Sequence, residues 1–208
     1  MDATSLASAH QAFAALYAGS DDPWNIDCGW YEQRKRAVLL ACLPREHFDV
    51  IFEPGCGTGA LSVALAARCR RLIACDIAPR AIALAQQRLA QCDNVELSCL
   101  QIPEAWPAVM TAASIDCVII SELAYFLPLD AQRTLLAHVR WCLKPDGVLV
   151  ACNWNRDFAA RTTSTASFHA QIAAATGLQR LVQHAETDFL LEVWCGDPRS
   201  VAQLEGRT

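Results

Sequence analysis

Short apolar runs alternate with longer amphipathic segments through most of this 208-residue chain. The run 115–121 is apolar at almost every position, which is typical of a strand buried on both faces of a parallel sheet. Between such runs, apolar side chains return at helical spacing, as at Ile82, Ala85 and Leu89. The pattern predicts strands at 49–53, 72–76, 95–100, 115–121 and 148–153, and two more between 178 and 195. It predicts helices at 5–18, 32–43, 58–68, 79–92, 131–143 and 165–175.

Strands that alternate with helices predict an α/β fold with a mostly parallel, seven-stranded sheet, an antiparallel C-terminal strand pair and helices on both faces. The length fits one domain, in which a helical segment, residues 1–43, precedes a core at 49–208. Sheets of this kind bind ligands outside the carboxyl ends of their strands, where the strand order reverses. We therefore expect site residues near 53–59, 76–77, 101–102 and 121–125.

Composition narrows the class of protein. The formal net charge of −5 argues against a nucleic-acid partner, which would need a basic face. No apolar stretch approaches the roughly 18 residues of a membrane span, and the first residues lack the plan of a signal peptide. The eleven cysteines are odd in number and stand singly, mostly within apolar runs. We therefore expect reduced core side chains in a cytoplasmic protein that has no metal site.

A glycine-rich loop follows the first predicted strand, where residues 53–59 read Glu-Pro-Gly-Cys-Gly-Thr-Gly. Glycines at alternate positions let the backbone turn tightly and approach a ligand closely. The spacing differs from the GxGxxG of dinucleotide-binding loops, and the Gly-Lys-Ser/Thr of an NTPase loop is missing. Asp76 ends the second strand, where a carboxylate can accept hydrogen bonds from both hydroxyls of a ribose.

The Glu-x-Gly-x-Gly-x-Gly loop and the acidic residue after the second strand resemble the class I S-adenosylmethionine-dependent methyltransferases. The resemblance implies a Rossmann-like fold, S-adenosylmethionine as cofactor and S-adenosylhomocysteine as its product. The alternatives are an NAD-binding loop and a glycine-rich turn without a ligand. The family pattern places Glu53 at the ammonium end of the cofactor, Asp76 at its ribose, and Ile77, Gln101 and Ile102 at its adenine. The remaining implied cofactor contacts are Gly55, Cys56, Gly57, Gly59 and Ser121.

A closer resemblance extends over most of the chain. Its pieces are Asp-Pro-Trp at 22–24, Trp-Tyr-Glu-Gln-Arg-Lys at 30–35, Ala-Pro-Arg-Ala-Ile at 78–82, Ser-Glu-Leu-Ala-Tyr-Phe-Leu at 121–127 and the tail at 188–194. They are similar to the nodulation-protein-S-like methyltransferases, whose founding members N-methylate the deacetylated amino sugar at the end of a chitooligosaccharide. The resemblance implies N-methylation of a small amine, an amino sugar or a similar metabolite. Residues 153–155 read Asn-Trp-Asn where family members often have His-Trp-Arg, so no charged acceptor contact is carried over there.

Three aromatic residues, Trp24, Trp30 and Tyr31, precede the core. In this fold, the helices before the first strand commonly cover the cofactor, so residues 1–43 are expected to form a helical lid. Aromatic faces attract cations and the sulfonium is a cation, so Trp24 and Tyr31 are predicted cofactor contacts. The alternative is that these side chains only anchor their helix on the sheet.

Glu122, Tyr125 and His169 are the candidate catalytic residues. Glu122 follows the fourth strand at the switch point, where it could deprotonate or orient an amine. Tyr125 shares its face if a helical turn begins there. His169 matches a recurrent histidine of the wider family, and the reference pKa of histidine side chains suits proton transfer. The respective alternatives are a cofactor-side or helix-start carboxylate, a hydrophobic wall of the site and an ordinary partly exposed histidine.

Two other functions remain open from the sequence. One is an O-methyltransferase that acts on a small metabolite, and the other is a non-catalytic S-adenosylmethionine-binding protein that regulates or scaffolds a partner. Amino-methyltransferases of nucleic acids tend to carry Asn/Asp-Pro-Pro-Tyr/Phe where this chain reads Ser-Glu-Leu-Ala at 121–124. We therefore expect a small-molecule acceptor, and the small size of the chain favours a monomer or homodimer.

Overall fold

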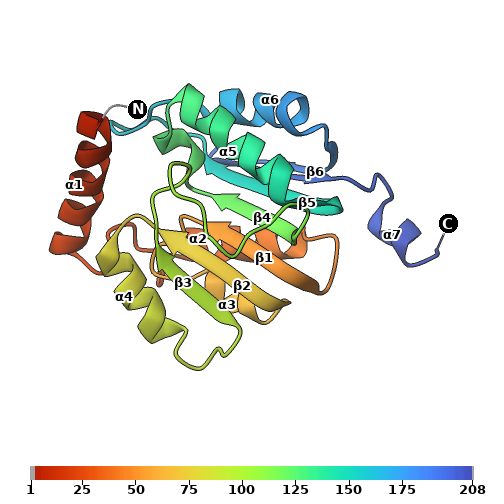
Figure 1. Ribbon diagram of the computed structural model, residues 1–208, viewed down its shortest axis with the longest axis horizontal. Helices are drawn as coiled ribbons and strands as arrows, with labels where there is room; N and C mark the ends of the chain where they lie inside the picture. Colours follow the sequence, from red (N-terminus) through yellow and green to blue (C-terminus); the bar gives the residue numbers. More distant parts are fainter. Residues whose placement is uncertain (1–2, 208) are drawn as a thin grey trace.

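The computed structural model describes residues 3–207, with side chains from residue 11 onward. Its centre is a seven-stranded sheet in the order β3-β2-β1-β4-β5-β7-β6 (Figure 1). All neighbouring strands are parallel except at β7, which is antiparallel to both β5 and β6. This confirms the predicted α/β, Rossmann-like sheet. The strands are β1 (Phe48–Pro54), β2 (Cys69–Asp76), β3 (Val95–Cys99), β4 (Ile115–Ser121), β5 (Leu143–Trp154), β6 (Gln179–Ala185) and β7 (Phe189–Cys195).

Helices cover both faces of the sheet, because successive strand residues point to opposite sides. Ile51 and Phe52 of β1 are both buried, but Ile51 joins a core cluster with Leu39 of α2, and Phe52 joins a second cluster with Leu135 of α5. The helices are α1 (Ala3–Gly19), α2 (Trp30–Ala41), α3 (Ser62–Ala66), α4 (Pro79–Arg88), α5 (Leu129–Cys142), α6 (Thr165–Thr176) and α7 (Val201–Leu204), with a 3-10 turn, η1 (Ala124–Phe126).

Helix ends follow local chemistry where the sequence carries a clear signal. Pro79 opens α4, where its missing N–H costs no hydrogen bond. The Ser164 hydroxyl caps α6 by accepting from the Ser167 N–H at 3.1 Å, and Gly177 ends that helix with a φ of 70°. The helix predicted at 58–68 is shorter in the structure, where α3 covers only Ser62–Ala66. The glycine loop takes up the preceding residues, since Gly59 has a φ of 80°, which an α-helix does not allow.

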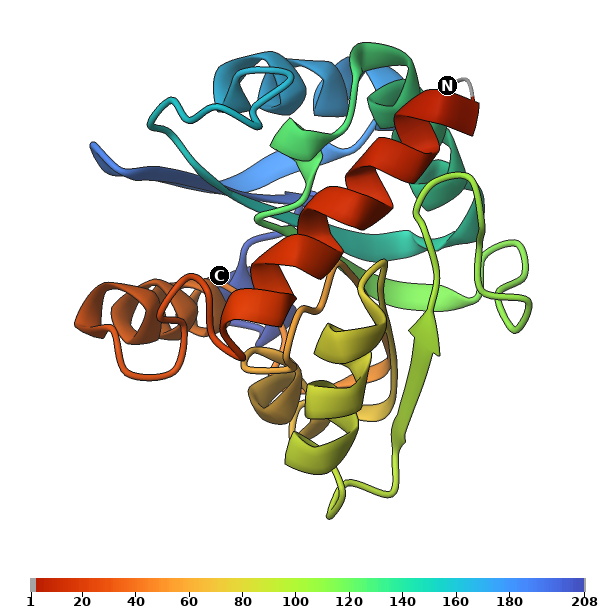
Figure 2. The ribbon, with the colours of Figure 1, turned by 90° about the vertical axis from the view of Figure 1, so that its left-hand side faces the viewer.

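The N-terminal segment lies across the carboxyl ends of the central strands, and Figure 2 shows α1 crossing the front of the molecule there. Tyr17 of α1 packs with Ala78 and Ala81 at the start of α4. Ion pairs hold the following loop to α4, with Asp21 and Arg80 2.8 Å apart. α1 therefore covers the edge of the sheet at which the site is expected.

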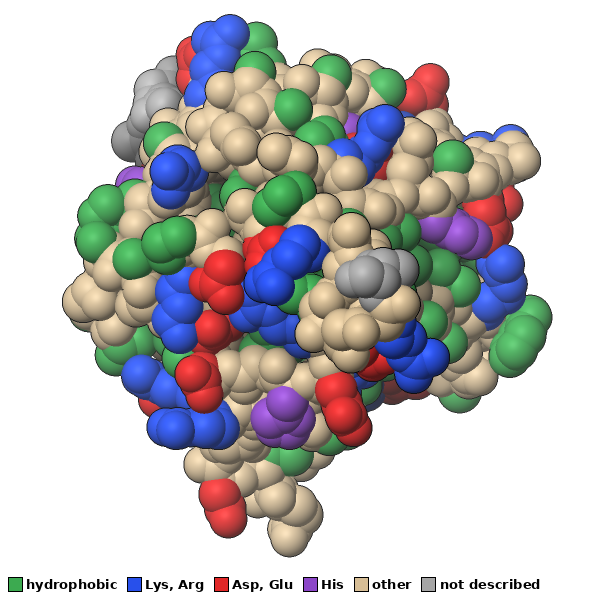
Figure 3. All heavy atoms as spheres, turned by 90° about the vertical axis from the view of Figure 1, so that its right-hand side faces the viewer, with side chains coloured by type: hydrophobic (Ala, Val, Ile, Leu, Met, Phe, Trp, Pro, Cys, Tyr) green, Lys and Arg blue, Asp and Glu red, His purple; other side chains and the backbone are tan. Residues whose placement is uncertain are grey.

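Most of the cysteines lie in the core of the protein. All eleven cysteines are free and seven are buried. Burial raises the pKa of the Cys75 thiol to about 12, so it is protonated and packs as a small apolar side chain. On the face opposite α1, acidic and basic side chains are interspersed (Figure 3). Within residues 3–207, no helix combines the length and the apolar character needed to cross a membrane.

Candidate functional site

Two loops meet where the strand order reverses. β1 lies between β2 and β4, and its glycine loop contacts the segment that follows β4. A Cβ placed on Gly55 would lie 3.3 Å from Cδ1 of Leu123. On the other side, the N–H groups of Gly55 and Cys56 both donate to the Cys75 carbonyl, at 2.7 and 3.0 Å. The fold thus brings the predicted cofactor loop beside the predicted catalytic segment.

The three glycines of the loop adopt left-handed backbone conformations. The φ angles of Gly55, Gly57 and Gly59 are 74°, 55° and 80°. A side chain at any of them would be strained, and a Cβ on Gly57 would lie 3.6 Å from the Tyr17 hydroxyl. The loop therefore forms a cradle of bare backbone beneath α1.

Asp76 ties the cradle to the end of β2. Its Oδ2 accepts from the Gly57 N–H and its Oδ1 accepts from the Ala78 N–H, both at 2.9 Å. Burial raises the pKa of Asp76, and these two hydrogen bonds oppose the shift. A carboxylate has about four acceptor sites, so oxygen lone pairs are left for the hydroxyls of a ligand.

Glu53 is a buried carboxyl under the same loop, with 3% of its surface exposed. The Ser62 hydroxyl donates to its Oε2 at 2.6 Å. Burial raises the pKa of Glu53 to about 7, although the Ser62 hydrogen bond acts in the opposite direction. A carboxyl in this state suits a cationic group bound beside it, because a positive neighbour would restore its charge.

The residues predicted at the adenine lie at the ends of β2 and β3. These strands pair up to Asp76 and Cys99, so Ile77, Gln101 and Ile102 follow at the same edge of the sheet as the cradle. Ile102 is buried and Ile77 is half-buried. Their contact with an adenine stays a prediction.

An aromatic group from the N-terminal segment lies over the cradle. The ring centroid of Trp24 is 5.6 Å from that of Tyr17 and 6.4 Å from that of Phe13. Tyr17 is only 5% exposed, and its burial together with the charge of Asp76 holds the pKa of the phenol above its usual range. Trp24 therefore lies in the group that covers the cradle, next to a tyrosine that sequence reasoning did not select.

A second group surrounds Glu122, at the end of β4. Lys35 Nζ donates to Glu122 Oε1 at 2.9 Å, and the Trp154 backbone N–H donates to Oε2 at 3.1 Å. The Tyr125 hydroxyl also donates to Oε2, and Lys35 pairs with Glu32 at 2.9 Å. Glu122 has a φ of 55°, a left-handed conformation that costs a non-glycine residue roughly 1–3 kcal/mol. Glu122 and Tyr125 are together as expected, and Lys35 and Glu32 join them from α2.

The charges of this group leave an excess of negative charge. Burial disfavours the ammonium of Lys35, but Glu122 and Glu32 outweigh that effect and hold its pKa above the usual range. Burial and the neighbouring Glu122 likewise raise the pKa of Tyr125, which is therefore neutral. One ammonium and two carboxylates carry a net charge of −1, and the adjacent Arg161 guanidinium, 5.5 Å from the Tyr125 ring centroid, is offset by Asp157 at 3.5 Å. The group suits a cationic ligand.

Tyr31 belongs to this second group, whereas Trp24 lies in the group that covers the cradle. Its ring packs against Trp154 and Phe189, with centroid distances of 5.4 and 6.3 Å. Lys35 Nζ lies 4.9 Å from the centroid of the same ring. Tyr31 therefore anchors α2 on the ends of β5 and β7, and its contact with a cofactor stays a prediction. Ser121, half-buried, pairs in register with Cys152 of β5 just before Glu122.

His169 does not face the site. It is 4% exposed, with Nδ1 2.9 Å from Glu192 Oε2 and Nε2 3.1 Å from Asn153 Oδ1. Both ring nitrogens are therefore engaged inside the protein. This burial contradicts the alternative of a partly exposed histidine and does not support the predicted catalytic role. The helical pattern around 165–175 shows that a helix forms, but not how deeply this side chain lies.

Comparison with known proteins agrees with this geometry. Residues 51–147 match a family described as a methyltransferase domain. A protein from Pseudomonas syringae, whose crystal structure is described as that of a methyltransferase, is 40% identical with a TM-score of 0.69, over 80% of this chain and 99% of that one. The chain belongs to the methyltransferase family.

Two further proteins, both named nodulation protein S or NodS, are similar to this methyltransferase. Nodulation protein S of Sinorhizobium fredii is 29% identical over 133 residues, which are 63% of this chain. The match spans about 60% of the length of that curated relative. The crystal structure of the N-methyltransferase NodS from Bradyrhizobium japonicum WM9 in complex with S-adenosyl-L-homocysteine has a TM-score of 0.78 at 26% identity, over 91% of this chain and 98% of that one. The predicted similarity to nodulation protein S and the predicted class I fold are confirmed.

Among the members of the two groups that sequence reasoning did not select are Lys35 and Tyr17. Both precede the part of this methyltransferase that matches the family domain, residues 51–147. Lys35 ends the Trp-Tyr-Glu-Gln-Arg-Lys piece at 30–35, so the resemblance contained a signal for it. Tyr17 had none, because it is one of two aromatic residues in a helix whose apolar positions form no clear stripe.

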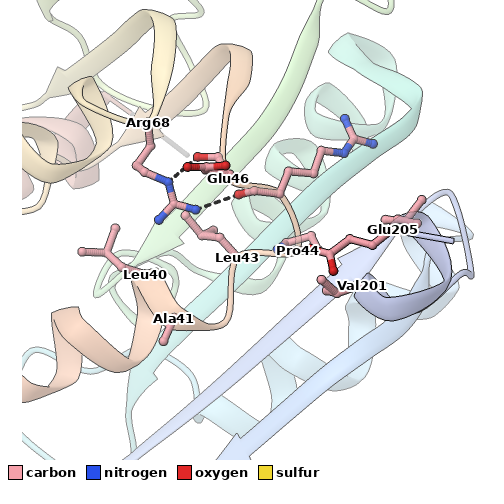
Figure 4. Close-up of a pocket in the computed structure, with 10 residues that line it drawn as sticks. Leu40, Ala41, Leu43, Pro44, Glu46, Arg68, Val201 and Glu205 are labelled. Atoms are coloured by element: carbon pink, nitrogen blue, oxygen red, sulfur yellow. Dashed lines mark hydrogen bonds between the residues drawn. The ribbon is translucent and has the colours of Figure 1, made fainter. Parts of the chain in front are cut away.

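Other candidate sites of this methyltransferase lie apart from these groups. In the part of the chain that the structure describes, no three His, Cys, Asp or Glu side chains lie close enough together to hold a metal ion. A pocket of about 720 Å³ lies between the end of α2 and α7 (Figure 4). It is lined by Arg68, which donates to the backbone carbonyls of Arg45 and Glu46. These residues precede β1 and β2, whereas the glycine loop follows β1, so the pocket is at the opposite edge of the sheet.

Proposed function

We propose that this methyltransferase transfers a methyl group from S-adenosylmethionine to the nitrogen of a small amine. S-adenosylmethionine supplies an electrophilic methyl group carried on a sulfonium. The cradle fits such a cofactor, because its three glycines present bare backbone and Asp76 retains free acceptor sites. A methyl group on Gly57 would enter the space between the loop and Tyr17.

Each cofactor role in the proposal is supported by the chemistry of a side chain. Glu53 would face the cofactor's ammonium, which would restore the charge that burial disfavours. Asp76 would accept from the ribose hydroxyls, and Ile77 would pack on the adenine with Gln101 and Ile102. Trp24, with Tyr17, would cover the ligand from α1's side.

The observation that carries the choice of an amine is the net negative group around Glu122. A cationic amine is attracted to this group, whereas a neutral hydroxyl gains much less from it. Glu122 already accepts three hydrogen bonds, from Lys35, Tyr125 and the Trp154 backbone. We therefore assign to Glu122 the role of orienting the amine through one N–H rather than that of a base. Solvent takes the proton that the amine loses.

The acceptor tested first is an amino sugar, because the similarity to nodulation protein S favours that class. The wild-type protein is assayed with glucosamine oligomers and simple amines, and its affinity for S-adenosylhomocysteine is measured by calorimetry. Turnover with an amine supports the proposal. Turnover only with hydroxyl acceptors would favour the O-methyltransferase alternative, and binding without any turnover would favour a non-catalytic protein.

The variant Glu122→Gln tests the proposed orienting role. We expect kcat/KM for the amine to fall about 10–100-fold, since a charged hydrogen bond to the acceptor is lost. The affinity for S-adenosylhomocysteine should not change. Asp130→Asn is the matched control, because its side chain is 94% exposed in α5. Weaker cofactor binding with normal turnover would make Glu122 a cofactor ligand instead.

A further inference from the structure

Lys35 is a buried cation that the cofactor chemistry does not require. It is 5% exposed and lies on α2, before the segment that matches the family domain. Its Nζ is 2.9 Å from one oxygen of Glu122 and 2.9 Å from one oxygen of Glu32. The ammonium therefore links a helix that precedes the core to the carboxylate at the end of β4.

Stability alone does not explain a buried ion pair of this kind. The cost of removing an ammonium from water largely cancels its attraction to carboxylates, and well-packed apolar residues commonly do as well. The next residue, Arg34, provides a comparison on the same helix, since it pairs with Glu186 at 2.8 Å with 42% of its side chain exposed. Fixing α2 to the rest of the protein thus does not depend on a buried charge.

We propose that Lys35 is a positioning residue for methyl transfer, an inference that rests on the proposed function. Lys35 holds Glu122 by Oε1, while Tyr125 and the Trp154 backbone hold Oε2, so the plane of the carboxylate is fixed from two sides. Without Lys35, Oε1 has no ammonium to hold it and Glu32 repels it. The carboxylate then turns about its contacts at Oε2 and presents its free lone pair in the wrong direction.

The net charge of the group makes it possible to distinguish a positioning role of Lys35 from an effect on the attraction of the amine. Replacing Lys35 by methionine changes the net charge of the group from −1 to −2. A cationic amine would then be attracted more strongly, so the KM of the amine should not rise. A positioning role predicts instead that kcat falls, because a misoriented acceptor reacts more slowly.

The test compares wild type, Lys35→Met, Glu122→Gln and the double variant on the amine that the wild-type protein methylates. We expect Lys35→Met to lower kcat about 10–100-fold, with no increase in KM and unchanged affinity for S-adenosylhomocysteine. Adding Lys35→Met to Glu122→Gln should reduce kcat no further, because Lys35 acts through Glu122. Arg34→Met is the control on the same helix and should keep the wild-type kcat.

Melting temperatures of the same four proteins give a readout that needs no acceptor. Lys35→Met should melt about 5–10 °C lower, since it leaves two half-buried carboxylates without their cation. The double variant should lose less than the sum of the single losses. If Lys35→Met does not fold, Lys35→Arg provides a second variant, because a guanidinium keeps the positive charge but differs in geometry from an ammonium. The kcat of Lys35→Arg should also fall.

A normal kcat in a folded Lys35→Met or Lys35→Arg variant overturns the inference. It is also overturned if the losses of kcat in the two single variants multiply in the double variant. A lower melting temperature with normal kcat would leave Lys35 a purely structural residue. Failure of the wild-type protein to methylate any amine is a separate result, which would overturn the proposed function and this inference with it.

Discussion

Glu53 is the residue whose environment most directly links the site to pH. It lies under the glycine loop with its carboxyl buried and a single hydroxyl, from Ser62, as hydrogen-bond partner. Burial raises its pKa to about 7 from an ordinary value of 4.5. The folded protein therefore holds the proton of Glu53 over a pH range in which the unfolded chain has already lost it.

This difference predicts how stability changes with pH. A raised carboxyl pKa contributes stability that is complete below about pH 4.5 and is lost as the pH rises through about 7. Relative to Glu53→Gln, the free energy of unfolding of the wild-type protein should fall by about 2–3 kcal/mol between pH 5 and pH 8. Urea unfolding at both pH values measures it, with the exposed Glu104→Gln as control. Equal pH dependence of wild type and Glu53→Gln would contradict the assignment.

Single residues were predictable from the sequence where their role is set locally. Gly57 and Asp76 were found because the loop and the strand end that hold them are continuous in sequence. Lys35 and Tyr17 were not, because their partners at Glu122 and Gly57 are brought to them only by the folded chain. His169 was misplaced for the same reason, since its burial depends on Glu192 of β7 and Asn153 of β5.

Among the elements, α6 shows how one backbone conformation ends a helix. Gly177 follows the helix with a φ of 70°, and its N–H donates to the Ala173 carbonyl at 3.0 Å. A Cβ at this position would meet no atom within 4 Å. The free-energy cost of a Cβ at Gly177 therefore comes from the left-handed backbone conformation and not from a steric clash.

We expect Gly177→Ala to destabilise the protein by about 1–2 kcal/mol, the cost of a left-handed conformation for a residue with a Cβ. The free energy of unfolding in urea measures it. Gly19→Ala is the control at the end of α1, where a Cβ also meets nothing within 4 Å and φ is not left-handed. A loss no larger than that of the control would contradict this account of the helix end.

The order of elements was predictable because buried parallel strands form apolar runs that helical segments separate. The main error lies at residues 58–61, where apolar and small side chains favour a helix but the glycine loop takes up the chain. α7 was not predicted, since four residues are too few to produce a periodic pattern. Local propensity thus fails where a loop conformation or a very short element decides.

At the scale of the molecule, the carboxyl edge of the sheet divides into two halves. The ends of β1 and β2 hold the cradle, Glu53 and Asp76, with α1 across them. The ends of β4 and β5 hold Glu122 and the Trp154 backbone, with α2 beside them. Variants in one half should therefore affect ligand binding at the other half little.

S-adenosylhomocysteine provides the test of this division. At 100 times its Kd, it should stabilise the wild-type protein by about 2.7 kcal/mol, and Glu122→Gln by the same amount. Asp76→Ala should bind it with about 1–3 kcal/mol less free energy, so the same ligand concentration stabilises that variant much less. Thermal unfolding with and without the ligand measures all three. Equal stabilisation of wild type and Asp76→Ala would remove Asp76 from the cofactor half.

The strand order has a consequence for how the site comes into being. β6 lies at the edge of the sheet and pairs only with β7, which in turn pairs with β5. β6 can therefore join the sheet only together with β7, as one antiparallel hairpin. β1 must in turn wait for β4, with which it pairs at residues far along the chain. Pairings between distant strands form slowly. We therefore expect the junction of β1 and β4, where the cradle meets Glu122, to form later than the pairings between strands that are closer in sequence.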